Sequence, residues 1–212
     1  MLVIAHRGYS DKCGDNNIPS FLEAVHYGFD MVEMDIQLCK TGEIIVYHDT
    51  YLHNKPISDY TFKELQENDI VGLSTVFDII KIETIKIYLD IKGNTDVIYP
   101  LIDMLRSRFS SRQLQRIYIS GFSRHFVKPL LESKIPVKIG LSICNSFEKN
   151  DLEYLIRNMN FVCMDWSSLN HENIEMLHNK GIFVYTFTCS DDYILQHMKQ
   201  FKIDGIVTNY VL

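Results

Sequence analysis

Short runs of β-branched and apolar residues alternate along this chain with longer segments of helical spacing. Nine such runs occur: Leu2–Ala5, Met31–Asp35, Ile44–Tyr47, Ile85–Ile91, Arg116–Ser120, Val137–Ser142, Phe161–Asp165, Ile182–Phe187 and Gly205–Thr208. Strands that alternate with helices are typical of βαβ units, in which a helix crosses from one parallel strand to the next. The alternation therefore predicts an α/β protein with a parallel sheet.

The intervening segments carry apolar residues on one side of a helix. Five are well defined: Ser20–Gly28, Val97–Phe109, Phe147–Met159, His171–Gly181 and Asp191–Phe201. Two of them end at a glycine, the residue that commonly follows a last helical turn. Ser190 stands just before the last segment, so we expect it to cap that helix.

One connection is too short for a crossover helix. Only Ile36–Glu43 separates the second run from the third, and its Thr41-Gly42 pair suits a hairpin. The third run then lies outside the parallel set, and His48 comes to lie roughly opposite Asp35. The remaining eight runs describe a compact (β/α)8 barrel, also called a TIM barrel.

The length of 212 residues is near the lower limit for such a barrel. We expect one barrel domain over residues 1–212. The usual last helix is expected to be missing, because the chain stops soon after Gly205–Thr208. Its absence predicts uncovered apolar surface near the terminal strands, which a second copy would cover in a homodimer.

Composition excludes several classes of protein. Apolar residues make up 46% and charged residues 23%, as in ordinary globular domains and unlike disordered or collagenous chains. The net charge of -6 argues against a nucleic-acid partner. No apolar run reaches the roughly 18 residues of a membrane span. No secretory signal is evident and the five cysteines form no CxxC pair, so we expect a cytoplasmic setting.

Chemically capable residues follow the first strands of the predicted barrel, at the end where such folds carry their active sites. Glu33 and Asp35 share one face of a strand because they are two residues apart. Asp90 adds a carboxylate from another strand. Such a triad suits a hard cation such as Mg2+ or Ca2+, although surface acids or a buried ion-pair network would give the same pattern.

Two histidines accompany the carboxylates. His6 and His48 both follow strand runs, and a pair of histidines beside an anion site can serve as base and acid. Arg7 suits bidentate binding of phosphate, and Lys92 lies on the same side of its strand as Asp90. A lone histidine at a strand end is more often structural, but together these residues favour a metal, a phosphate and proton transfer.

These motifs, in this order, resemble the glycerophosphodiester phosphodiesterase family. The matching pieces are His6-Arg7-Gly8, Glu33-Met34-Asp35, Gly42, His48-Asp49, Leu89-Asp90-Ile91-Lys92, Gly181, Thr186 and Asp204-Gly205-Ile206-Val207-Thr208. The family fold is a (β/α)8 barrel. The resemblance implies hydrolysis of a small-molecule glycerophosphodiester to glycerol 3-phosphate and an alcohol, with Ca2+ or Mg2+ as cofactor.

The resemblance also implies roles for individual residues. His6 and His48 match the general acid and base. Glu33, Asp35 and Asp90 match metal ligands, while Arg7 and Lys92 match positions that hold phosphate. Asp15 stands in Gly14-Asp15-Asn16-Asn17, where the family has Pro-Glu-Asn-Thr, and we expect it to contribute to substrate binding.

Several positions depart from the family pattern. Asp15 and Asp90 are each one methylene shorter than the usual glutamate, Tyr185 replaces a tryptophan, and Asn209 replaces a common aspartate. The Asp90 and Lys92 pair also resembles the pattern of the sphingomyelinase D-type toxins, which use aspartate at that position. Those toxins lack an Arg-Gly pair after the first histidine, which is present here as Arg7-Gly8. Two other functions stay open: a phospholipase D or lyase acting on lysophospholipids to give a cyclic phosphate, and a catalytically inactive barrel that binds a phosphodiester.

Overall fold

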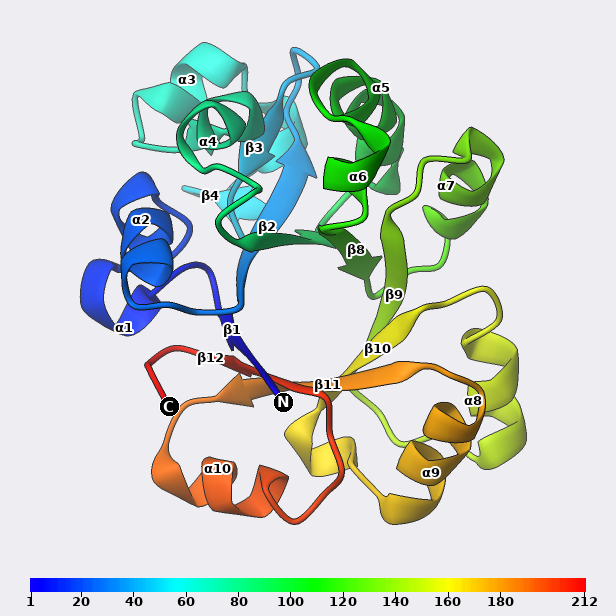
Figure 1. Cartoon of the computed structure of the whole chain (residues 1–212). Helices are drawn as coiled ribbons and strands as arrows, with labels where there is room; N and C mark the ends of the chain where they lie inside the picture. Colours follow the sequence, from blue (N-terminus) through cyan, green and yellow to red (C-terminus); the bar gives the residue numbers. More distant parts are fainter.

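The computed structural model describes residues 1–212 and contains a closed barrel of parallel strands with helices around it (Figure 1). The barrel strands are β1 (Leu2–Ala5), β2 (Met31–Leu38), β7 (Lys86–Ile91), β8 (Ile117–Gly121), β9 (Lys138–Ile143), β10 (Phe161–Asp165), β11 (Phe183–Cys189) and β12 (Gly205–Thr208). Strand β1 pairs in parallel with both β2 and β12, which closes the ring. The predicted (β/α)8 barrel is confirmed.

Helices follow seven of the eight barrel strands. They are α1 (Ser10–Cys13), α2 (Ile18–His26), α3 (Phe62–Gln66), α4 (Leu73–Ile79), α5 (Ile98–Arg108), α6 (Ser111–Leu114), α7 (Val127–Ser133), α8 (Lys149–Leu155), α9 (His171–Asn179) and α10 (Asp192–Met198), with short 3-10 turns η1 (Ile57–Asp59), η2 (Thr95–Val97) and η3 (Trp166–Ser168). Four of the five expected segments contain one of these helices, and α2 begins at Ile18, two residues before the fifth, Ser20–Gly28. The expected cap at Ser190 is wrong: Asp191 caps α10, because its carboxylate accepts the amide of Ile194 at 2.9 Å.

The short second connection is a hairpin, as its length predicts. Strand β3 (Ile44–Val46) runs antiparallel to β2 and pairs in turn with β6 (Val71–Gly72). A small ribbon of β4 (Tyr51–Leu52) and β5 (Lys55–Pro56) follows. The amide of Tyr47 donates to the carbonyl of Asp35 at 3.0 Å, so His48 lies one residue beyond the position opposite Asp35.

The barrel interior is polar at the carboxyl ends of the strands and apolar nearer their amino ends. The apolar part is filled by the buried side chains of Ile4, Met31, Tyr88, Phe161, Cys163, Tyr185 and Val207. Gly140 makes room for Phe161, since a Cβ at residue 140 would lie 2.3 Å from that ring. Two residues further along β2 and β7 the inward positions become carboxylates, so the polar layer lies at the carboxyl ends of the strands.

No helix follows β12, yet the strand itself is not left uncovered. All four residues of β12 are buried, and Ile206 is 0% exposed. Ile206 shares one apolar core with Phe21 of α2 and Met198 of α10, the helices on either side. The neighbouring helices therefore cover this strand, whereas Met1, Val211 and Leu212 beside it are exposed. The homodimer stays a prediction.

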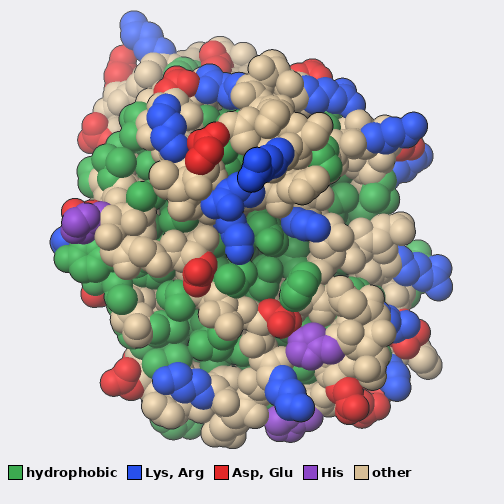
Figure 2. Space-filling view, in the orientation of Figure 1, with side chains coloured by type: hydrophobic (Ala, Val, Ile, Leu, Met, Phe, Trp, Pro, Cys, Tyr) green, Lys and Arg blue, Asp and Glu red, His purple; other side chains and the backbone are tan.

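Charge is spread unevenly over the molecule. Figure 2 shows Lys and Arg side chains close together near the middle of one face, bordered by hydrophobic side chains, although the net charge is -6. None of the helices combines the length and the apolar character that crossing a membrane requires.

Candidate active site

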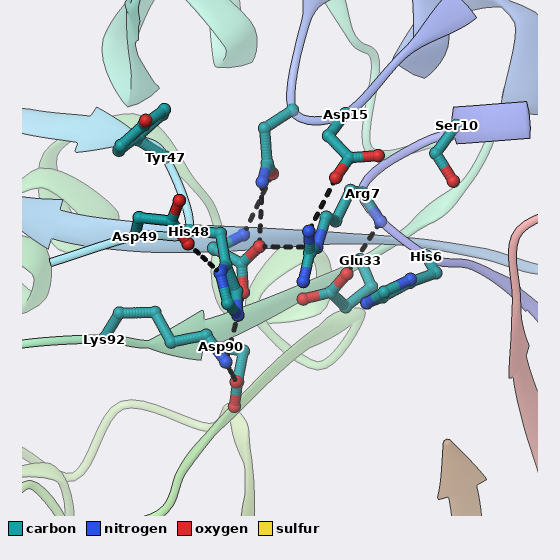
Figure 3. A network of polar contacts seen from close by, with 12 residues as sticks. His6, Arg7, Ser10, Asp15, Glu33, Tyr47, His48, Asp49, Asp90 and Lys92 are labelled. Carbon is teal, nitrogen blue, oxygen red and sulfur yellow. Dashed lines mark hydrogen bonds and ion pairs between the residues drawn. The ribbon is translucent and has the colours of Figure 1, made fainter. Parts of the chain in front are cut away.

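A cavity of about 170 Å³ opens at the carboxyl ends of the barrel strands. Seven of the eight candidate residues line it: His6, Arg7, Glu33, Asp35, His48, Asp90 and Lys92. Asp15 does not line the cavity but contacts Arg7 from outside it (Figure 3). The closed barrel explains this convergence, because β1, β2 and β7 are adjacent in the ring.

Three carboxylates form the floor of the site. One oxygen each from Glu33, Asp35 and Asp90 lies within 4.8 Å of the others, and these residues are only 4%, 1% and 6% exposed. Burial, followed by the charges of Asp35 and Asp90, raises the pKa of Glu33 well above its usual value. Three buried carboxylates this close need positive charge, and their hard oxygen atoms suit a divalent cation.

Lys92 supplies part of that positive charge from the protein. Its ammonium group lies 3.2 Å from Asp35 and donates a short hydrogen bond to Asp90. Burial acts to lower the pKa of Lys92, but the charges of Asp90 and Asp35 outweigh it and raise that pKa. Lys92 is thus a fixed cation beside the carboxylates.

Arg7 supplies the second cation through an unusual backbone geometry. Its φ of 56° lies in the left-handed region. This turn lets the Arg7 amide donate to the Glu33 carboxylate at 2.8 Å while the guanidinium reaches Asp15 at 2.6 Å. Gly8 follows with a φ of 83°, and a Cβ there would lie 2.3 Å from the Ser20 hydroxyl, which explains the glycine.

The guanidinium of Arg7 is only partly satisfied by the protein. Its Nε atom lies 3.3 Å from Asp35 but is buried without a hydrogen-bond partner. A buried donor without a partner is costly unless a ligand completes it. The Nε atom is thus paired electrostatically with Asp35, and the guanidinium as a whole suits an anion such as phosphate.

The two histidines enter the cavity from different sides and each holds a partner through Nδ1. His6 lies 2.6 Å from the side-chain oxygen of Asn209, and His48 lies 2.7 Å from the carboxylate of Asp49. Neither Nε2 atom has a hydrogen-bond partner in the protein. Both Nε2 atoms are therefore free for a reacting group in the cavity.

Four further residues support the site, and none was assigned a role from the sequence. The Asn16 amide donates to Asp35 at 2.8 Å, the hydroxyls of Ser120 and Ser142 donate to Asp90 at 2.7 and 2.9 Å, and Asn209 contacts His6. Asn16 had a signal, since it stands at the asparagine of the family segment Pro-Glu-Asn-Thr. Serines inside strands carry no such signal.

Replacing Ser120 with alanine is expected to weaken binding of Mg2+ or Ca2+ by about 10-fold, because an outer hydrogen-bond donor fixes the Asp90 carboxylate. Ser120 is fully buried and also contacts the Tyr88 hydroxyl at 2.8 Å. Titration calorimetry would measure the affinity, with Ser107→Ala on exposed helix surface as a control. An unchanged affinity would show that Ser120 does not orient Asp90.

Comparison with known proteins gives a family match over almost the whole chain. Residues 6–212 match the model of the glycerophosphoryl diester phosphodiesterase family. A glycerophosphodiester phosphodiesterase of Caldanaerobacter subterraneus is 25% identical over 98% of this chain and 93% of its own length. A human lysophospholipase D is 29% identical over 52% of this chain and 42% of its own length.

Solved structures agree with the fold. A glycerophosphodiester phosphodiesterase from Thermotoga maritima is 26% identical, with a TM-score of 0.79 over 99% of this chain and 94% of its own. An Oleispira antarctica phosphodiesterase, solved with sn-glycerol-3-phosphate, has a TM-score of 0.84 at 21% identity, over 99% of this chain and 93% of its own. The second likeness extends to the fold alone.

Proposed function

Because this chain belongs to the glycerophosphoryl diester phosphodiesterase family, a family of phosphoric diester hydrolases, we propose that it hydrolyses glycerophosphodiesters to glycerol 3-phosphate and an alcohol. We propose residues 1–212 as one catalytic domain. The observation that supports this most is the convergence of three carboxylates, two cations and two histidines on one cavity. Each group has a task in cleaving a phosphate diester.

Glu33, Asp35 and Asp90 would hold a divalent cation, Ca2+ or Mg2+. When bound there, the cation supplies positive charge to the nonbridging oxygens of the phosphate. The buried triad and its oxygen donors fit such an ion. Asn16 and Ser120 fix the carboxylates from outside through the hydrogen bonds already described.

Arg7 and Lys92 would bind the phosphate directly. Both are anchored by acids, Arg7 by Asp15 and Lys92 by Asp90, so their charges are in place before substrate arrives. Preorganised positive charge stabilises the negative charge that develops on phosphate oxygens in the transition state. Asp15 would thus act on substrate through Arg7.

His6 and His48 would carry the protons. One Nε2 takes the proton of the attacking oxygen as its bond to phosphorus forms. The other Nε2 gives a proton to the leaving alcohol as its bond to phosphorus breaks. The attacking oxygen belongs either to water or to the substrate's own 2-hydroxyl, which gives a cyclic phosphate that water then opens.

The test is release of glycerol 3-phosphate from glycerophosphocholine and glycerophosphoethanolamine, with Ca2+, Mg2+ or EDTA. We expect release that EDTA abolishes and either metal restores, because the carboxylate triad leaves too much negative charge near the phosphate without a cation. Absence of release with every metal, from protein with a normal unfolding transition, would contradict the proposal.

We propose as the second candidate that the same site acts on lysophospholipids. Phe122 lines the cavity, is 49% exposed and packs edge-on against Phe187 with ring centroids 6.2 Å apart. Exposed aromatic surface beside the site offers a contact for an acyl chain. Choline or a stable cyclic phosphate formed from lysophosphatidylcholine, without glycerol 3-phosphate from soluble diesters, would favour this function.

A further inference from the structure

Basic side chains gather at the amino ends of the barrel strands, which is the end opposite to the cavity. Lys86 begins β7, Lys138 begins β9, and Arg116 directly precedes β8. Each stands two residues before a position that faces the barrel interior: Tyr88, Tyr118 and Gly140. Side chains two residues apart share a face of a strand, so Lys86 and Lys138 point toward the barrel axis.

Strand pairing brings these three cations close together. Lys86 and Arg116 lie side by side, because the residues that follow them are paired between β7 and β8. Lys138 is paired with Tyr118 on the other side of β8. Neighbouring strands are about 4.8 Å apart, which long basic side chains span easily. Figures 1 and 2 look onto this end of the barrel, where the N-terminus lies, and Figure 2 shows Lys and Arg side chains close together near its middle.

None of the three cations is neutralised within the protein. Every ion pair of the structure uses other basic residues. The ammonium groups of Lys86 and Lys138 have no hydrogen-bond partner, and Arg116 donates only through Nε, to the carbonyl of Ile82 at 2.6 Å. Like charges this close repel one another, and an anion bound among them would remove that repulsion. The cluster is therefore suited to an anionic partner.

The acidic residues nearby are bound to other groups. Asp30 and Asp204 accept backbone amides of β1 and β11 at 2.8 and 2.7 Å, and Glu83 accepts the side-chain amide of Gln113. These carboxylates fix the strand ends and a loop. The basic cluster thus keeps its charge although the whole chain has a net charge of -6.

Apolar side chains border the cations on the same end of the barrel (Figure 2). Phe183, which begins β11, is 53% exposed, and Met1, which precedes β1, is 62% exposed. Basic side chains beside exposed apolar ones suit the surface of an anionic bilayer, where cations meet lipid phosphate groups and apolar side chains enter the acyl boundary. A free phosphate ion or a nucleic acid would engage the cations but leave Phe183 and Met1 in water.

We propose that the amino end of the barrel is a docking surface for an anionic phospholipid bilayer. Lys86, Arg116 and Lys138 contact lipid phosphate groups, while Phe183 and Met1 enter the interface. The cavity opens at the other end of the barrel, so docking leaves it facing water and open to soluble substrates. Docking goes beyond the proposed function and is measured without any substrate.

The first experiment measures sedimentation of the full chain with vesicles of phosphatidylcholine, alone or mixed with phosphatidylglycerol. We expect binding to the mixed vesicles only, and weaker binding at higher salt, because exposed charges are screened. Lys86→Gln combined with Lys138→Gln should lower the partition coefficient about 25-fold, since each basic residue near an anionic leaflet contributes about a factor of five. Equal binding of wild type to both kinds of vesicle would overturn the proposal.

Lys63→Gln combined with Lys149→Gln is the matched control, because it removes the same charge from exposed positions on α3 and α8. This control should bind the mixed vesicles like wild type. Lys86→Arg combined with Lys138→Arg keeps the charge and should bind as well, and urea unfolding checks the fold of each variant. A loss in the control pair equal to that in the Lys86 and Lys138 pair would mean attraction by net charge alone and would overturn the docking surface.

The second experiment identifies which end of the barrel contacts lipid. Trp166, the one tryptophan of the chain, lies in η3 directly after β10, at the carboxyl end. Lipids with brominated acyl chains quench tryptophan fluorescence at short range, so they should leave Trp166 unquenched. Phe183→Trp in a Trp166→Phe background should be quenched.

The reverse pattern of quenching would place the cavity mouth on the bilayer and overturn the proposal. Binding of inorganic phosphate or single-stranded DNA that Lys86→Gln with Lys138→Gln abolishes, without binding of vesicles, would overturn it in favour of another anion.

Discussion

Replacing His6 or His48 with alanine is expected to lower kcat by about 100-fold or more in each case, because a positioned proton donor or acceptor contributes that much to catalysis. Both rings line the cavity with Nδ1 already bound, which leaves Nε2 for the reacting oxygen. Steady-state kinetics on glycerophosphocholine measures the effect, and KM should change much less than kcat.

His125→Ala is the control for these variants, because His125 is exposed and lies outside the cavity. Its kcat should equal that of wild type. Activity near wild type in both His6→Ala and His48→Ala would disprove the two-histidine assignment, whatever the substrate.

Replacing Asp35 with asparagine is expected to lower kcat/KM by about 1,000-fold. Asp35 is a candidate metal ligand and also lies 3.3 Å from Arg7 and 3.2 Å from Lys92. The substitution weakens the candidate cation site and removes the carboxylate that positions both cations, and loss of one preorganised electrostatic group lowers the rate by about 100- to 1,000-fold. The same variant should lose calorimetric Mg2+ or Ca2+ binding.

Asp78→Asn controls for loss of an ion pair alone, since Asp78 is exposed and binds Arg108 far from the site. Wild-type metal affinity in Asp35→Asn would remove Asp35 from the metal site. Urea unfolding of each variant shows whether a loss of activity or of metal binding is caused by loss of the fold instead.

The barrel could be predicted because its signals are local. Apolar runs of strand length and helical spacing alternate in nearly every unit, and the short Ile36–Glu43 connection identifies β3 as the strand outside the ring. The cap of α10 could not be assigned correctly, since Ser190 and Asp191 are both good caps and only the backbone decides between them. The burial of β12 depends on how α2 and α10 pack around it, and the sequence pattern does not determine this packing.

The residues of the candidate site likewise include some that could be predicted from the sequence and some that could not. Residues with a distinctive motif, such as His6-Arg7 or Glu33-Met34-Asp35, could be named from the sequence together with the expected strand ends. Ser120 and Ser142 could not, because a serine within a strand is ordinary until the ring places it 2.7–2.9 Å from Asp90. Contacts between strands depend on register, which a single sequence leaves undetermined.

The pairing of β1 with β12 also has a consequence for how the protein is made. During synthesis from the N-terminus, the outer edge of β1 has no partner until residues 205–208 have emerged. Such late, long-range pairing makes folding slow, and until it forms the unpaired edge of β1 is exposed and prone to aggregation. A nascent chain that stops short of Thr208 has neither a closed ring nor Asn209 beside His6, so ribosome-bound fragments are expected to be inactive and prone to aggregate.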